Sequence, residues 1–178
     1  MTDNQEMAAF AAAVYGPDTA DRAALSRFVE KLKASGARVG GILQEEIRGP
    51  GGERKGIDAI DISTGRRIAI KRPPKHAIKD DGECGLDVFA LTETTGIIRD
   101  AIKDRPDLVV VEKFGAQEEK GEGLSDEILQ TIAEGIPLLI AVPEKALPTW
   151  RRRSGGLGRV LSFNEDAFHE WWRGVSRR

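Results

Sequence analysis

Two short stretches of purely apolar residues constrain the fold most strongly: LVVV at 108–111 and PLLIAV at 137–142. Neither stretch alternates between polar and apolar residues, which is typical of strands buried on both faces of a parallel sheet. The segment between them has helical character, with Ser125 as its expected N-cap and Gly135 at its end. This order predicts an α/β fold in three layers, with a mainly parallel sheet between two layers of helices.

The rest of the chain continues the alternation of strands and helices. We predict strands at 8–15, 37–44 and 159–163, a hairpin made of IDAIDI and RIAIK, a helix from Asp18 or Thr19 to Gly36, a second helix that Pro106 stops, and a last helix capped by Asn164. The strands at 8–15 and 37–44 are expected to be parallel, with a right-handed crossover between them. With no internal repeat and no long linker, residues 1–178 are expected to form a single domain with its ligand site near the carboxyl ends of the strands.

Composition limits the classes of partner. The net charge of −2 and the pI near 5.8 argue against general binding to nucleic acid or to an anionic membrane. The single cysteine, Cys84, rules out an intramolecular disulfide and fits a reducing compartment. The apolar residues 7–15 are too few to span a bilayer and follow acids rather than a basic segment. We therefore expect a cytoplasmic protein with no membrane insertion.

The first strand ends in YGPDTADRAAL, where a phosphate-binding loop would lie. A loop of the form G-x-x-x-x-G-K-S/T aligned on Gly16 would place Asp21 at the second glycine, Arg22 at the lysine and Ala23 at the hydroxyl. An aspartate about 4 Å from a phosphate would cost about 4 kcal/mol at an effective dielectric constant near 20, or about a thousandfold in affinity. The pattern indicates a degenerate phosphate loop with Arg22 offsetting part of this cost, or simply a capped helix start with Asp18 and Asp21 on the helix dipole.

The second candidate is the end of the LVVV strand. Four apolar residues followed by Glu112 match the arrangement that places a magnesium-binding acid in phosphoryl-transfer proteins. Lys113 stands where a second acid would orient water, and a charged lysine cannot accept a proton, so hydrolysis by that route is expected to be lost or very slow. The alternative is that Glu112 and Lys113 form a solvated pair that ends a buried strand.

These motifs resemble a known group of proteins. EEIRGPGGERKGIDAIDISTGRRIAI, LVVVEKFGAQE and IPLLIAVPE are similar to the nucleoside-triphosphatase family first described from thermophiles, which has a P-loop NTPase fold. The segments at 41–44, 84–87 and 113–124 resemble, more closely still, a divergent family of unknown function that is often encoded beside molybdate-transport genes. The resemblance extends from about residue 8 to the tryptophans near the C-terminus. It implies that Glu112 is the metal-side acid and that Glu118 corresponds to a later family glutamate, and Lys113 departs from the hydrolytic pattern.

Two further segments are candidate binding surfaces. RRIAIKRPPKHAIK gathers seven basic residues within fourteen positions, and Arg72 and Lys75 are its proposed oxyanion ligands; solvated hairpin charge is the alternative. Trp150 precedes Arg151, Arg152 and Arg153, which suggests either a clamp on a nucleotide base or an amphipathic surface anchor. Cys84 lies just before a predicted helix and reads as a reactive thiol or a half-buried structural residue.

The sequence thus predicts a P-loop-fold protein that has lost hydrolysis or retains little of it. It would bind a nucleotide, a phosphate or a similar oxyanion, as an accessory factor in molybdate or molybdenum-cofactor metabolism. The candidate ligand-binding residues are Gly16, Asp21, Arg22, Lys113, Arg72 and Lys75, with Glu112 as a metal ligand and Glu112 and Glu118 as catalytic residues if the protein is active. No cofactor is required, and magnesium would accompany a nucleotide. The alternatives are a scaffold that docks a protein partner without a small ligand, and a magnesium-dependent nucleoside triphosphatase with an atypical site.

Overall fold

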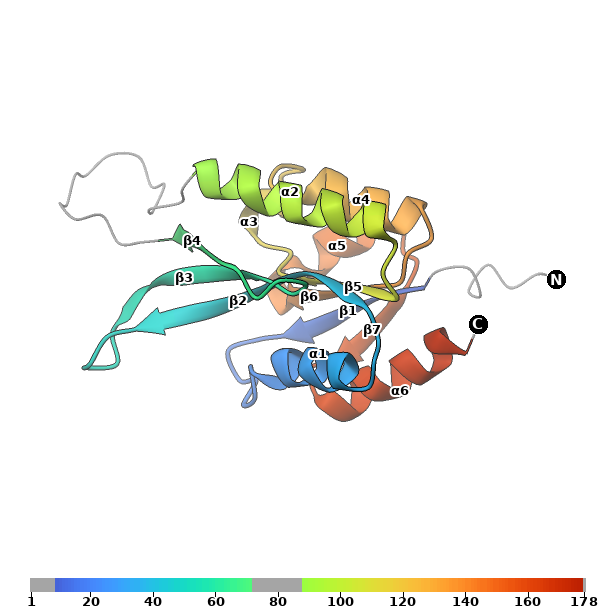
Figure 1. Cartoon of the computed structure of the whole chain (residues 1–178), viewed down its shortest axis with the longest axis horizontal. Helices are drawn as coiled ribbons and strands as arrows, with labels where there is room; N and C mark the ends of the chain where they lie inside the picture. The colour runs from blue at the N-terminus through green and yellow to red at the C-terminus, as the bar shows by residue number, and fades with distance from the viewer. Residues whose placement is uncertain (1–8, 72–87, 178) are drawn as a thin grey trace.

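The computed structural model describes residues 9–71 and 88–177, and these form a seven-stranded sheet with the order β4-β3-β2-β5-β6-β1-β7 (Figure 1). The strands are β1 (Phe10–Tyr15), β2 (Val39–Arg48), β3 (Arg54–Asp61), β4 (Arg67–Lys71), β5 (Leu108–Glu112), β6 (Leu138–Pro143) and β7 (Arg159–Ser162). The five strands β2, β5, β6, β1 and β7, which are neighbours in this order, run parallel to one another. Strand β3 is antiparallel to β2, and β4 is antiparallel to β3. The prediction of a mainly parallel α/β sheet with a hairpin is confirmed.

Helices cover both faces of the sheet. They are α1 (Ala24–Ala34), α2 (Val88–Asp104), α3 (Ala116–Glu119), α4 (Ser125–Ala133), η2 (Glu144–Ala146), α5 (Leu147–Arg153) and α6 (Glu165–Ser176). Helices α2, α4 and α5 lie on one face, and α1 and α6 lie on the other (Figure 1). Within the described part of the chain, no helix combines the length and the hydropathy that a bilayer span requires.

The central strand β5 explains why its sequence shows no polar alternation. Val109 and Val111 belong to the core under α2 and α4, whereas Leu108 and Val110 belong to the core under α1 and α6. All four side chains are fully buried. Because successive residues of a strand point to opposite faces, a strand between two helical layers must be apolar at every position.

Strand β2 approaches β5 closely at Gly41. Its φ is +114°, and a Cβ added at this position would lie 2.0 Å from the carbonyl oxygen of Val110. No other residue type fits there without moving one of the two strands. This glycine sets the spacing of the strand pair that leads to Glu112.

Strand β2 also extends four residues beyond its predicted end at Gln44. Its first part, Val39–Ile42, pairs with β5, and its second part, from Ile42 to Arg48, pairs with β3. The β2–β3 ribbon projects past the helical layers (Figure 1). The predicted hairpin therefore exists, but β2 forms a third strand of it.

The ends of the helices differ from two of the predictions. The N-cap of α1 is Ala23 rather than Asp18 or Thr19, because the chain first turns through residues 16–23 and Ala24 then donates to the carbonyl oxygen of Asp21. The N-cap of α4 is Leu124, since Ser125 already donates to Glu122 in the preceding turn. The predicted cap of α6 is confirmed: Asn164 Oδ1 accepts a hydrogen bond of 2.8 Å from the backbone N–H of Ala167.

The interpretation of Trp150 as a surface residue is wrong. Helix α5, which the sequence analysis did not predict, turns this side chain into the core, where it is 2% exposed. Its ring packs edge-on against Phe114 and Phe10, with centroid distances of 5.4 and 6.1 Å. The indole therefore cannot stack on a base, although the three arginines that follow it are exposed.

Candidate functional site

The carboxyl ends of β1, β5 and β6 bring the two predicted strand-end motifs together. Tyr15 pairs in register with Pro143, and Glu112 pairs with Ala141. Since Val110 faces α1 and α6, the alternation of the strand directs Glu112 to the same face. That face carries α1, the helix that follows the Gly16 loop. We call the end of the sheet formed by Tyr15, the loop 16–23, Glu112, Lys113 and Glu144 the carboxyl edge.

Glu112 is a buried acid at the centre of this edge. It is 8% exposed, and its Oε1 accepts a hydrogen bond of 2.8 Å from the backbone N–H of Gln44 on β2. Burial raises the pKa of Glu112, while the Gln44 hydrogen bond and the charges of Arg22 and Lys113 act in the opposite direction. The peptide bond between Glu112 and Lys113 is cis. The carboxyl group is thus fixed by a neighbouring strand and lies within electrostatic range of two cations.

The loop after β1 closes tightly on itself. The backbone N–H of Gly16 donates to Thr19 Oγ1 at 2.9 Å, and the N–H of Thr19 returns a bond of 3.1 Å to the carbonyl oxygen of Gly16. A Cβ at Gly16 would lie 2.5 Å from the carboxyl carbon of Glu144. Gly16 is therefore required for the side chain of Glu144 to lie against the loop.

Glu144 is a further residue of this edge, and it was not among the site residues predicted from the sequence, although the sequence contains a signal for it. This acid directly follows the buried strand β6, in the same way that Glu112 ends β5. Because β6 lies between β1 and β5, its end must meet the same edge of the sheet. Glu144 places an exposed carboxylate at the entrance of the loop.

Asp21 is turned toward α1 and α6 by an ion pair with Arg27. Arg27 also pairs with Glu165 at 2.8 Å, and Glu165 in turn pairs with Lys31 at 2.7 Å. The negative charge of Asp21 is thus offset by Arg27, a partner that the sequence did not indicate. The repulsion expected between Asp21 and a phosphate is correspondingly smaller.

Arg22 instead lies over the ring of Tyr15. Its guanidinium carbon is 3.6 Å from the centroid of the Tyr15 ring and 5.8 Å from that of Phe163. Burial raises the pKa of Tyr15; the charge of Arg22 lowers it and that of Glu112 raises it. Arg22, Tyr15 and Glu112 therefore form one electrostatically connected group at the carboxyl edge.

Glu118 holds together the loop that follows β5. It is buried, its Oε2 accepts from the backbone N–H of Gly115 at 3.2 Å, and its Oε1 accepts from that of Leu124 at 3.5 Å. Burial raises the pKa of Glu118, whereas these hydrogen bonds and the charge of Lys113 lower it. Lys113 is half-buried and lies within electrostatic range of both Glu112 and Glu118. In this structure the carboxylate of Glu118 is engaged by backbone groups.

The structure thus gathers Gly16, Arg22, Glu112 and Lys113 at one edge, while Asp21 and Glu118 are engaged by neighbouring groups. Two arginines of the predicted basic patch are also paired: Arg66 with Glu93 at 3.3 Å, and Arg67 with Glu45 at 2.8 Å. The other candidates Arg72, Lys75 and Cys84 lie outside the described residues.

The donor set of the carboxyl edge fits magnesium only as a companion of phosphate groups. Glu112 supplies one carboxylate, and Ala23, at the position where the sequence comparison with a standard phosphate loop expects a hydroxyl, has no oxygen in its side chain. Among residues 9–71 and 88–177, no three His, Cys, Asp or Glu side chains gather as a metal site. Magnesium is commonly bound by one or two carboxylates together with substrate phosphates, so Glu112 would be the protein ligand.

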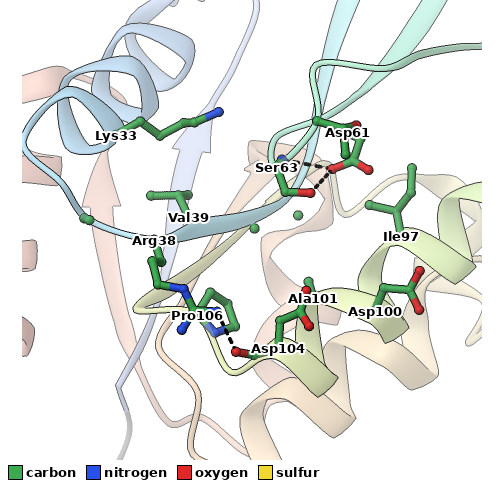
Figure 2. Close-up of a pocket in the computed structure, with 14 residues that line it drawn as sticks. Lys33, Arg38, Val39, Asp61, Ser63, Ile97, Asp100, Ala101, Asp104 and Pro106 are labelled. Carbon is green, nitrogen blue, oxygen red and sulfur yellow. Dashed lines mark hydrogen bonds between the residues drawn. The ribbon is translucent and has the colours of Figure 1, made fainter.

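A pocket of about 440 Å³ lies at the opposite end of the sheet, near the amino ends of β2 and β5 (Figure 2). Its two basic residues are engaged by backbone carbonyl groups. Arg38 donates to Asp104 O at 2.8 Å, and Lys33 donates to Ile62 O. Asp61 accepts from the hydroxyl and the backbone N–H of Ser63. The hydrogen bond of Arg38 joins the start of β2 to the C-terminal end of α2. None of the residues that line this pocket belongs to the strand-end motifs.

The mainly parallel sheet, its two helical layers, the loop between β1 and α1 and the acid that ends β5 define an α/β protein of the P-loop NTPase-like class. The chain belongs to the family described as "Protein of unknown function (DUF2478)", whose model matches residues 10–171.

Three relatives place this family beside known proteins. The chain is 38% identical over 168 residues to the "Molybdenum import ATP-binding protein ModC 2" of Bradyrhizobium diazoefficiens, a match that covers 94% of this chain and 18% of that protein. It is 30% identical over 114 residues to the "Nucleoside-triphosphatase THEP1" of Pyrobaculum aerophilum, covering 64% of this chain and 61% of the relative. The THEP1 of Methanothermobacter thermautotrophicus is 26% identical over 139 residues, with 77% and 78% covered. The chain thus spans less than a fifth of ModC 2 and less than two thirds of the first THEP1. No solved structure matches this chain.

Proposed function

We propose that this protein binds a nucleotide, a phosphate or a similar oxyanion at its carboxyl edge. The observation that carries the proposal is the approach of Arg22 and Glu112 beside the start of α1, where a guanidinium and a helix N-terminus both attract an anion. The ion pair of Asp21 with Arg27 supports it, because the acid that would repel an anion is offset. The names of the relatives, an ATP-binding protein and nucleoside triphosphatases, point to the same ligand class.

We further propose that hydrolysis is absent or very slow. Lys113 follows the strand-end acid where a proton acceptor is needed, and its charged form cannot take a proton from water. Ala23 has no hydroxyl with which to bind magnesium. Glu118, the remaining candidate acid, accepts hydrogen bonds from two backbone groups. These features support binding without rapid turnover.

An accessory role in molybdate handling is the corresponding proposal for the biological context. The relative named for molybdenum import contains a region similar to 94% of this chain within a much longer protein. That observation also favours the second candidate function, a module that docks on a protein partner. Of the two docking surfaces suggested by the sequence, the one that included Trp150 does not present this residue to a partner, because its side chain is buried in the core.

Binding is tested by thermal unfolding with ATP, GTP, phosphate, molybdate and tungstate. A ligand present at about 100 times its dissociation constant adds about 2.7 kcal/mol of stability, which for a chain of this size raises Tm by about 5–11 °C. Arg22→Ala should reduce the shift, whereas Arg151→Ala, which removes an equal charge from an exposed site on α5, should not. If none of the five ligands raises Tm, the binding proposal is wrong.

Turnover is tested separately by measuring phosphate release from ATP and GTP in the presence of magnesium. We expect no steady release above the background of a buffer control. Magnesium-dependent release that disappears in Glu112→Gln would contradict the non-hydrolytic proposal and establish an atypical nucleoside triphosphatase.

A further inference from the structure

The hydroxyl group of Tyr15 is the unusual feature of the carboxyl edge. Tyr15 is the only tyrosine in the sequence and is 6% exposed, and its buried Oη makes no hydrogen bond of normal geometry among the described residues. The guanidinium of Arg22 lies close enough to interact with this oxygen, but it can only donate, so the O–H of Tyr15 has no acceptor. Buried polar groups are nearly always paired, because an unpaired one costs about 1–3 kcal/mol. Packing alone would be met at lower cost by phenylalanine. Packing in the core therefore does not explain why this position carries a hydroxyl group.

The position of Tyr15 supplies one. It ends β1 and directly precedes Gly16, so it lies at the base of the loop that leads to α1. Its ring packs edge-on against the buried Phe163 at a centroid distance of 5.6 Å and is covered by Arg22 at 3.6 Å. Glu112 lies on the same face of the sheet, within electrostatic range of the hydroxyl group. The unpaired donor thus sits where the proposed anion would bind.

Two side chains that contact the Tyr15 ring differ in their exposure. Phe163 is 8% exposed and belongs to the core under α1 and α6. Arg22 is exposed and comes from the loop before α1. A ligand can reach the enclosed hydroxyl group only if a neighbour moves, and Arg22 is the neighbour that can move without opening the core.

We propose that Tyr15 is a ligand-binding residue whose hydroxyl group donates a hydrogen bond to a tetrahedral oxyanion, while Arg22 moves from the Tyr15 ring to the same anion. This inference rests on the proposed anion-binding function of the carboxyl edge. A free oxyanion and the terminal phosphate of a nucleotide share the required chemistry, since each is an anion that presents several acceptor oxygens at neutral pH to a phenol and a guanidinium. The cation over the ring and the unpaired donor beneath it form the ligand-free arrangement of one site.

The substitution Tyr15→Phe separates this role from packing. Phenylalanine keeps the ring against Phe163 and Arg22 and removes the hydroxyl group alone. Because the O–H of Tyr15 has no acceptor in the free protein, Tyr15→Phe should unfold at about the same Tm as the wild type. Its affinity for the anion should fall about tenfold or more, as expected for the loss of one hydrogen bond to a charged group. Thr64→Val, which removes a hydroxyl group from the turn between β3 and β4, should leave the affinity unchanged.

The single tyrosine also allows a direct reading of the site. Incorporation of 3-fluorotyrosine gives one ¹⁹F resonance, which reports the environment of the Tyr15 ring. We expect it to shift on titration with phosphate, molybdate or ATP, because Arg22 leaves the ring when the anion binds. A shift with phosphate or molybdate alone identifies a free oxyanion as the ligand, and a shift with ATP alone identifies the phosphate of a nucleotide; either result supports the inference.

The outcomes distinguish this inference from the function on which it rests. If the wild type gains thermal stability with a ligand, but Tyr15→Phe binds it equally well and the ¹⁹F resonance does not move, Tyr15 is not a ligand and the proposed function stands. If no ligand stabilises the wild type and the resonance is unchanged with all three, both are wrong.

Discussion

Replacing Trp150 with alanine should cost the fold far more than its position between polar residues suggests. The side chain is 2% exposed and contacts the rings of Phe10 and Phe114, which come from β1 and from the segment after β5. Truncation of a buried tryptophan to alanine costs about 3–5 kcal/mol in transfer and cavity energy. For a chain of 150–250 residues this corresponds to a fall in Tm of about 6–20 °C.

Urea denaturation followed by circular dichroism measures this loss directly. Trp150→Phe retains an aromatic ring and should lose less stability, which keeps the test informative if the alanine variant does not fold. Arg151→Ala, on the same helix but exposed, should change the unfolding free energy by no more than about 0.5 kcal/mol. A loss below about 1 kcal/mol for Trp150→Ala would refute the assignment of this residue to the core and return it to the surface.

Three further predictions concern the carboxyl edge and the last helix. Because burial raises the pKa of Glu112, the folded chain binds the proton of this carboxyl group more tightly than the unfolded chain does. The free energy of unfolding therefore falls as the pH rises from the pKa of Glu112 in the unfolded chain, about 4.3, through its higher pKa in the folded chain. The Tm advantage of Glu112→Gln over the wild type should therefore grow from pH 4 to pH 8 and be absent below pH 4; a constant difference would contradict the assigned cause. Glu144→Gln removes a carboxylate that lies against Gly16 and should tighten anion binding about fivefold in titration calorimetry, with no change if the anion binds elsewhere. Asn164→Ala should lower the free energy of unfolding by about 1 kcal/mol in urea, because the cap of α6 is lost, and an unchanged midpoint would show that the cap is dispensable.

The sequence was sufficient for the sheet because its strongest signals are local. An apolar run such as Leu108–Val111 favours a strand buried between two helical layers, and strands buried in this way are typical of parallel sheets. The cap of α6 was also predictable, since Asn164 and the backbone it binds lie three residues apart. The same reasoning located Gly16 and Glu112 at one end of the sheet.

The remaining features depend on contacts between distant segments. Nothing near Trp150 in the sequence indicates that Phe10 and Phe114 form its environment. Asp21 lies beside Arg22 in the sequence, but the fold pairs it with Arg27, one helical turn into α1. Glu144 became a site residue only once β6 was placed between β1 and β5.

Strand β2 connects the parallel core of the sheet to the β2–β3 ribbon. One half of it is clamped in the parallel core beside β5, and the other half forms a ribbon with β3 outside that core. Gln44 lies just past the junction, and its backbone N–H holds the carboxyl group of Glu112. The ribbon and the hydrogen bond that orients this acid thus belong to one continuous strand, so a bend of the ribbon near Gln44 would alter that bond. A molecule that binds to the ribbon could therefore change the orientation of the Glu112 carboxyl group without contacting the carboxyl edge.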